Sequence, residues 1–268
     1  HMEILCLMHY APKEMTARPG DNRMNGVAVG IVTENYNKDM PGRLKVKIPL
    51  RDEAANILDW AKVAVPYGGK EWGCRFLPEK DDQVLLAFEQ GSIKRPYIIG
   101  SLPRDEDKTV LETADEDNQI KQIVTKNGNS VVFTDHKDGS EKDSISISTS
   151  GDTCRIILSN EEKKISIADK ASGCSVELNF GDGGMKMSAE KKLTLSVGDS
   201  VSITLNGETG TVAVEADKVQ IRAGRSYEFT TDGTAKLSGQ QMSAEGTSAI
   251  KLSSSGMASL SGSPVKLG

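Results

Sequence analysis

The chain has 268 residues, a formal net charge of −5 at pH 7, 26% charged residues and 4% aromatic residues. This acidic balance argues against a dedicated nucleic-acid binder, because such proteins gain affinity from a basic surface. No apolar run approaches about eighteen residues, so no membrane span is predicted. The apolar start at residues 3–8 has no basic leader and predicts no signal peptide, and His1-Met2 resembles a cloning remnant.

The composition changes along the chain. Eight of the aromatic residues precede residue 100, and eight of the nine prolines precede residue 104. The front part is therefore expected to form a normal globular core. The remainder is rich in Ser, Thr, Gly and Lys and is not expected to do so by itself.

Residues 26–103 are predicted to form a small β-barrel, preceded by an N-terminal extension at 1–25. Short alternating segments lie between turn residues at 26–32, 43–48, 60–65, 73–77, 83–88 and 95–100. Five or six such strands fit the five-stranded Greek-key barrel called the OB-fold. Residues 104–118 follow, with seven acidic side chains, and are predicted to be a solvated connector.

Residues 119–268 are predicted to form a shaft of short repeated strands. Two strand patterns, 120–124 and 130–133, are joined by a turn at 126–129 that predicts a hairpin. From about residue 143, a pair of apolar residues at i and i+2 recurs roughly every eight positions, which predicts a β-solenoid. The first residues of the last pairs are Val219, Tyr227, Ala235, Met242, Ile250, Met257 and Val265.

One chain cannot stabilise such repeats alone. Each repeat would bury about two apolar side chains, which do not offset the entropy of ordering about eight residues. One chain could coil into a three-sided prism, or three chains could wind round one axis. A thin core and a unit longer than six residues favour three chains. The predicted shaft core comprises Leu195, Ile203, Val214, Ile221, Ile250 and Leu252. The predicted fold is all-β, an OB-fold barrel followed by an intertwined homotrimeric triple-stranded β-helix.

An ordered series of motifs in the front part is similar to a known family. The series is GIV at 30–32, DMPGRLKVKIP at 39–49, WAKVA at 60–64, GCRFLP at 73–78, DDQVLLAFEQG at 81–91 and RPYIIGSL at 95–102. It resembles the OB domain of the central spike proteins of contractile injection systems, which include phage baseplate spikes and the VgrG proteins of type VI secretion. The rear half is similar to the triple-stranded β-helix of that family.

The resemblance implies a structural spike without enzymatic activity or cofactors. Such a spike pierces the target envelope, makes transient contact with it, and links the hub and tube of a baseplate to a tip protein. A full VgrG carries a hub domain ahead of the barrel, and here only about 25 residues precede it. The resemblance therefore implies a separate hub protein, as in phage-tail-like particles. The protein would be made in the cytoplasm, assembled into the baseplate and ejected toward the target cell.

The C-terminal end is predicted to be a docking site. An apolar platform at the end of a solenoid marks a docking surface, because solenoid ends normally need a polar cap. The resemblance supplies the partner, a PAAR-repeat tip protein. The predicted docking residues are Pro264, Val265, Lys266 and Leu267.

No catalytic, cofactor-binding or metal-binding residue is predicted. The four cysteines form no CxxC pair and are expected to pack as small apolar residues in reduced form. His136 lies in a turn, and the C-terminus has no His-x-His motif. Residues 181–184 offer one carboxylate, which favours a plain turn over a calcium loop. The basic stripe Arg43, Lys45 and Lys47 lacks interleaved aromatic residues, so it predicts a solvated or partner-facing strand.

Two other functions remain open from the sequence. One is a β-helical tailspike-like fibre that binds or cleaves surface polysaccharide, which would need paired carboxylates in an aromatic-lined groove. The other is an OB nucleic-acid binder with an oligomerisation stalk. The scarcity of aromatic residues in the repeats and the acidic charge disfavour both.

Overall fold

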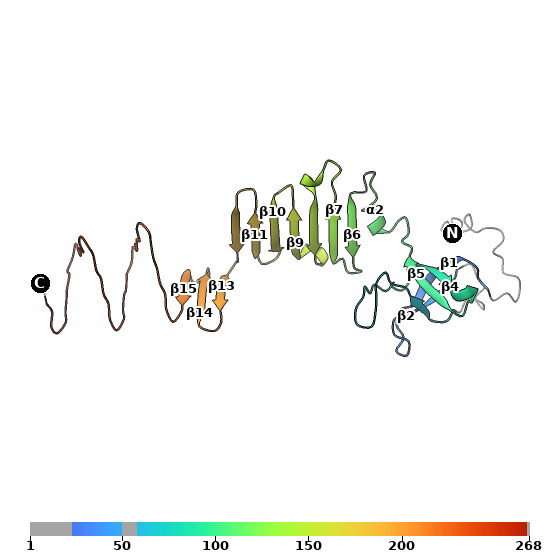
Figure 1. Cartoon of the computed structure of the whole chain (residues 1–268), viewed down its shortest axis with the longest axis horizontal. Coiled ribbons are helices and arrows are strands. Elements are labelled where there is room, and N and C mark those ends of the chain that lie inside the picture. Colours follow the sequence, from blue (N-terminus) through green and yellow to red (C-terminus); the bar gives the residue numbers. More distant parts are fainter. Residues whose placement is uncertain (1–22, 50–57, 267–268) are drawn as a thin grey trace. The chain divides into compact units, whose positions relative to one another are not determined.

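The computed structural model describes residues 23–49 and 58–266. The described chain is all-β, with one short α-helix, α2 (Lys108–Leu111), inside the acidic connector (Figure 1). Two compact units are present: one takes in the described residues up to Leu195 together with Ile203–Ala213, and the other the remainder. The all-β prediction is confirmed.

Five strands close into a barrel in the order β1-β2-β3-β5-β4 (Figure 1). They are β1 (Val27–Glu34), β2 (Arg43–Lys47), β3 (Ala61–Val63), β4 (Gln83–Phe88) and β5 (Pro96–Ser101). All neighbours are antiparallel except β3 and β5, which are parallel. A closed barrel has no free sheet edge. The predicted OB-like barrel is therefore present in the structure.

The barrel core follows from strand alternation. In β2, Leu44 and Val46 point inward and are buried, whereas Arg43, Lys45 and Lys47 are more exposed. Strands β1, β4 and β5 alternate in the same way. The core comprises Val32, Leu44, Val46, Ile48, Leu58, Ala61, Val84, Leu86, Phe88 and Ile98.

The segment between β3 and β4 differs from the prediction. The strand expected at 73–77 does not form, and Gly73 makes an isolated bridge to Gly68 instead. The front part has the expected buried core, but most of its described aromatic residues lie outside it. Phe88 is buried, but four others are exposed to solvent: Tyr36, Tyr67, Trp72 and Phe76.

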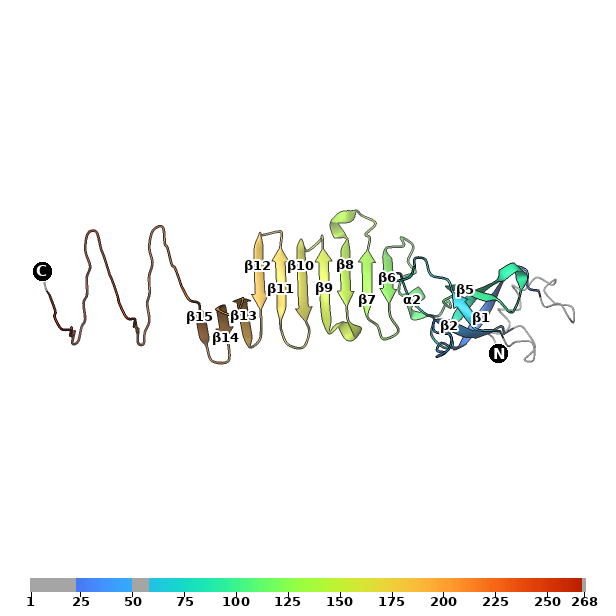
Figure 2. The same cartoon turned by 60° about the horizontal axis from the view of Figure 1, so that its bottom comes forward.

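Residues 120–188 form a seven-stranded antiparallel sheet in which consecutive strands are neighbours (Figure 2). The strands are β6 (Ile120–Val124), β7 (Ser130–Thr134), β8 (Ser144–Ser148), β9 (Cys154–Ser159), β10 (Lys164–Asp169), β11 (Ser175–Asn179) and β12 (Gly184–Ser188). The predicted hairpin at 126–129 joins β6 and β7, where the Thr125 amide donates to the Asn129 carbonyl at 2.8 Å. These seven strands pair within one chain.

The pairing within the chain ends beyond this sheet. A second sheet contains β13 (Lys192–Val197), β14 (Val201–Asn206) and β15 (Thr211–Glu215). Residues 216–266 contain no strand and make no hydrogen bond between main-chain groups within the described chain. Figure 1 shows them as long extended runs that turn back and forth. The expected repeats are therefore extended here but unpaired.

The barrel interior leaves no room for a side chain at Gly30 of β1. A Cβ atom there would lie 2.4 Å from Val46 Cγ1 and 2.8 Å from Leu86 Cδ1. We expect Gly30→Ala to destabilise the barrel by about 1–3 kcal/mol, because overpacking forces core side chains off their rotamers. Denaturant unfolding followed by tryptophan fluorescence measures this.

The matched control is Gly100→Ala on β5, where a Cβ atom would meet nothing within 4 Å. It should change the free energy of unfolding by less than about 0.5 kcal/mol. Equal effects of the two substitutions would contradict the packing described here.

Candidate assembly surface

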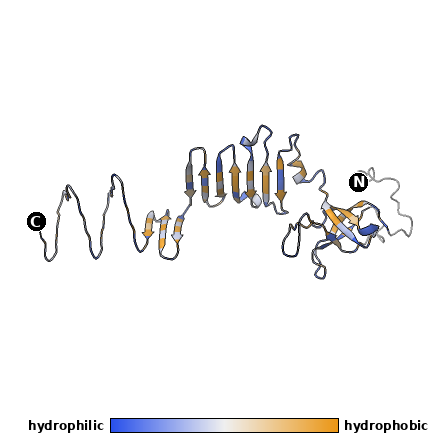
Figure 3. Ribbon diagram, in the orientation of Figure 1, coloured by the Kyte–Doolittle hydropathy of each residue, from blue (hydrophilic) through white to orange (hydrophobic). Residues whose placement is uncertain are grey.

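One face of the seven-stranded sheet carries two parallel rows of apolar side chains, here called the apolar stripe. The strand register aligns the rows directly, as in the pairs Ile147–Ile156 and Ile156–Ile167. The first row comprises Ile123, Val131, Ile147, Ile156, Ile167, Val176 and Met187. The second comprises Phe133, Ile145, Leu158, Ile165, Leu178 and Met185. The apolar bands across the strands are visible in Figure 3.

The opposite face of the sheet is polar. Because side chains alternate along a strand, the residues between the stripe positions face the other way. Most are small or charged, for example Ser146, Ser166, Glu177 and Lys186. The apolar exceptions are Ile120, Val124, Val132, Ile157 and Ala168. This is the pattern of a sheet with one solvated face and one face intended for burial.

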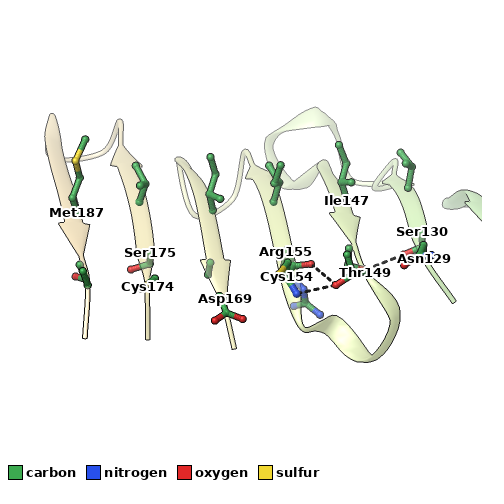
Figure 4. Close-up of a pocket in the computed structure, with 18 of the residues that line it drawn as sticks. Asn129, Ser130, Ile147, Thr149, Cys154, Arg155, Asp169, Cys174, Ser175 and Met187 are labelled. Atoms are coloured by element: carbon green, nitrogen blue, oxygen red, sulfur yellow. Dashed lines mark hydrogen bonds between the residues drawn. The ribbon is translucent and has the colours of Figure 1, made fainter. Parts of the chain in front are cut away.

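The apolar stripe is uncovered in the single chain. Ile167 is 49% exposed and Met185 is 60% exposed. The first row borders a groove of about 850 Å³ (Figure 4). Exposed apolar patches of this extent mark interaction surfaces, because covering them removes apolar area from water.

A polar row bounds the apolar stripe along one side. Asn129, Thr149, Cys154, Asp169 and Cys174 lie next to one another across neighbouring strands (Figure 4). The Thr149 hydroxyl accepts from the Cys154 amide at 3.0 Å, and Asn129 Oδ1 accepts from the Ser150 amide at 3.0 Å. These contacts engage Thr149 Oγ1 and Asn129 Oδ1 within the chain itself.

The carboxylate in this row stays ionised. Hydrogen bonds from the Ser172 hydroxyl and amide, together with the Ala171 amide, hold the pKa of Asp169 below its ordinary value. A charged, capped carboxylate is costly to bury, so it favours a solvated rim. The apolar width of the stripe is therefore limited to two side chains.

The cysteines do not pack as the sequence predicted. Cys154 and Cys174 are exposed in the chain, Cys74 is half-buried, and all three are free thiols. Cys6 lies outside the described residues. Within the described ranges, no group of three or more His, Cys, Asp and Glu side chains is placed to hold a metal ion.

The other polar motifs form local contacts. The His136 amide donates to Asp143 Oδ1 at 2.8 Å, within a turn. Asp182 accepts from the Gly184 amide at 2.8 Å, which closes the turn at 181–184. On the barrel, Lys45 pairs with Glu34 at 2.7 Å. No described helix has the length and apolar character needed to cross a membrane.

The structure places three of the predicted shaft-core residues on neighbouring strands of the second sheet and the other three in the unpaired region. Leu195, Ile203 and Val214 lie on β13, β14 and β15, and each is exposed. Ile221, Ile250 and Leu252 lie in the unpaired region and are also exposed. Of the tip residues, Pro264, Val265 and Lys266 are exposed, and Leu267 lies outside the described residues.

The barrel and the repeated sheet match known injector proteins. Residues 28–102 match the family model of the type VI secretion system/phage-baseplate injector OB domain. Over 222 residues the chain is 25% identical to the type VI secretion system spike protein VgrG1a of Pseudomonas aeruginosa, covering 80% of this chain and 34% of that protein. Over 111 residues it is 30% identical to the spike protein VgrG5 of the same organism, covering 39% and 14%.

These matches define an injector-type OB-barrel protein with a repeated β-sheet. The match over the barrel and the two spike relatives support an assignment to the VgrG and phage-baseplate spike family. It spans at most about a third of the length of the curated relatives it matches.

A charge placed in the apolar stripe tests whether the stripe is buried in the assembled protein. We expect Ile167→Asp to abolish assembly, because burying an unpaired carboxylate costs several kcal/mol. Light scattering on the purified chain would then report a lower mass than for the wild type.

The matched control is Ser166→Asp, one position along the same strand and on the opposite face. It should leave the mass unchanged. Loss of assembly in both variants would show that the two faces are not distinguished as described here.

Proposed function

We propose that this chain is the structural central spike of a contractile injection system and that it works as a homotrimer. Its role is mechanical and non-enzymatic. The observation that carries the proposal is the apolar stripe, which is uncovered in the chain. Beyond β13–β15, the main chain of residues 216–266 is also unpaired. The spike relatives from Pseudomonas aeruginosa support it.

The dimensions of the apolar stripe favour three copies. It is two side chains wide and seven strands long, which is about 30 Å at the usual strand spacing. Three narrow stripes facing one axis enclose a thin core, with their polar rims at the corners. Each sheet supplies its own hydrogen bonds, so the other copies need supply only apolar cover.

Residues 216–266 need partner chains more than the apolar stripe does. Extended main chain without hydrogen bonds is unfavourable when it is removed from water, and open strand edges invite pairing. In the proposed trimer, these runs pair with neighbouring copies and form the triple-stranded β-helix. Leu195, Ile203, Val214, Ile221, Ile250 and Leu252 then form the shaft core.

The assembled spike would act at the centre of a baseplate. Its barrels meet a separate hub protein, and its shaft points toward the target envelope, which it pierces when the particle contracts. The protein is made in the cytoplasm, assembled into the particle and ejected. Intertwined strands suit this task, because they unfold only when all three chains separate, which gives high kinetic stability.

The shaft tip is proposed to dock a PAAR-repeat protein. Val265 is 44% exposed, and its neighbours Pro264 and Lys266 are also exposed. Three copies of Val265 and Leu267 round one axis would form a small apolar platform, with Pro264 and Lys266 at its rim. Exposed apolar platforms of this kind favour docking.

The trimer itself is the first test. Light scattering is expected to report about three times the chain mass of 28.8 kDa, and the species should persist in mild denaturant. Ile250→Asp should abolish the soluble trimer, since three carboxylates would meet at one narrow axis. A monomeric wild-type protein would rule out both the shaft and the piercing role.

A truncation tests the tip. Deletion of residues 263–268 should leave a soluble trimer that no longer co-purifies with a co-expressed PAAR-repeat protein. Val265→Asp should have the same effect with the chain length preserved. Retention of the PAAR-repeat protein by both variants would place its docking site elsewhere.

A further inference from the structure

The barrel displays three exposed aromatic side chains on one short segment between β3 and β4. Tyr67 is 66% exposed, Trp72 is 59% exposed and Phe76 is 62% exposed. We call residues 67–76 the aromatic hairpin. Large aromatic side chains gain more from burial than most residues, so three on one exposed segment indicate an interaction surface.

The aromatic hairpin has a defined backbone structure. The Gly69 amide donates to the Trp72 carbonyl at 2.8 Å, and the Cys74 amide donates to the Tyr67 carbonyl at 2.9 Å. Gly73 has a φ of +151° and lies so close to its partner that a Cβ atom would be 2.9 Å from the Gly68 Cα atom. The aromatic side chains are therefore presented by an ordered turn.

The Trp72 side chain is fixed by a close backbone contact. Its indole ring lies against Gly69, where a Cβ atom would come within 2.5 Å of the ring carbons. The ring thus packs on the hairpin itself, and much of Trp72 still faces solvent. An ordered, half-packed tryptophan needs little further ordering on binding, which favours association.

The aromatic hairpin is continuous with the apolar stripe. Phe76 borders the same groove as Ile123 and Val131. Just after the hairpin, Glu79 pairs with Lys126 in the β6–β7 turn at 3.0 Å. Phe76, at one end of the aromatic hairpin, therefore adjoins the uncovered surface of the sheet at its β6 end.

We infer that the aromatic hairpin packs against a neighbouring copy of this chain, at the level of β6 and β7. This inference rests on the proposed trimer. Rotation about the three-fold axis does not shift a residue along that axis. The hairpin, which lies level with β6 in its own chain, therefore lies level with β6 of the next copy. Because the hairpin adjoins the apolar stripe, which other copies cover in the proposed trimer, we take a second copy of the chain as the partner that covers the hairpin. The hairpin then joins each barrel to the shaft of a neighbour.

Tryptophan quenching tests the inference directly. The chain has two tryptophans, so Trp60→Phe leaves Trp72 as the sole tryptophan, which can be excited selectively over the tyrosines. In the trimer, acrylamide quenching of Trp72 should be several-fold weaker than in the unassembled Ile167→Asp variant carrying the same Trp60→Phe change. If Trp60→Phe prevents folding, the quenching of Trp72 is obtained instead as the difference between the wild type and the Trp72→Phe variant.

The matched control places tryptophan at the exposed Tyr36, in a chain lacking Trp60 and Trp72. It should remain equally quenchable with and without assembly. A trimer in which Trp72 is as accessible as in the unassembled variant would overturn the inference and leave the trimer standing. Protection of Trp72 that requires an added hub protein would also overturn it. Absence of a trimer would overturn both the inference and the proposed function.

Discussion

The structure depends on one constraint: a single-layer sheet with one apolar face cannot bury that face by itself. Stable domains pack at least two layers around a core, and the described part of this chain provides one layer from β6 to β12. The alternation that makes Ile156 and Ile167 neighbours also makes Ser166 face the other way. The same period that builds the sheet thus creates the need for partners.

The chain becomes less self-sufficient toward its C-terminus. The barrel closes its own hydrogen bonds and buries its own core, including Leu44 and Leu86. The sheet from β6 to β12 closes its hydrogen bonds but leaves its apolar face open. Residues 216–266 do neither within the chain. In the proposed spike, the barrel and the sheet from β6 to β12 can fold before the chains assemble. Residues 216–266 form regular structure only when they pair with other copies.

Sequence reasoning was accurate where a local rule decides the structure. Alternation identified β2, and the turn at 126–129 identified the β6–β7 hairpin. It failed where long-range contacts decide. The segment at 73–77 has the apolar content of a strand, yet the close approach of Gly73 to Gly68 makes it part of a turn.

At the candidate site, too, local features could be predicted from the sequence and long-range features could not. The apolar pairs of the stripe are legible as an i, i+2 pattern, because side-chain direction is local. Whether neighbouring strands come from one chain or several is not local, since either pairing satisfies the same pattern. The turns decide it for β6 to β12. Short connections such as the one containing Gly128, with a φ of +90°, return the chain directly beside itself.

A mechanical role is consistent with the chemistry that the described residues display. Each reversal brings the next strand back in register, so the apolar stripe keeps a width of two side chains from β7 to β12. In the proposed spike, a core of constant width gives a shaft of uniform thickness. Asp169, held charged at the rim, limits that width, because a wider apolar surface would have to bury it. Polar residues such as Asp169 thus set the edges of the apolar stripe. In the proposed spike, the width of the stripe determines the thickness of the shaft.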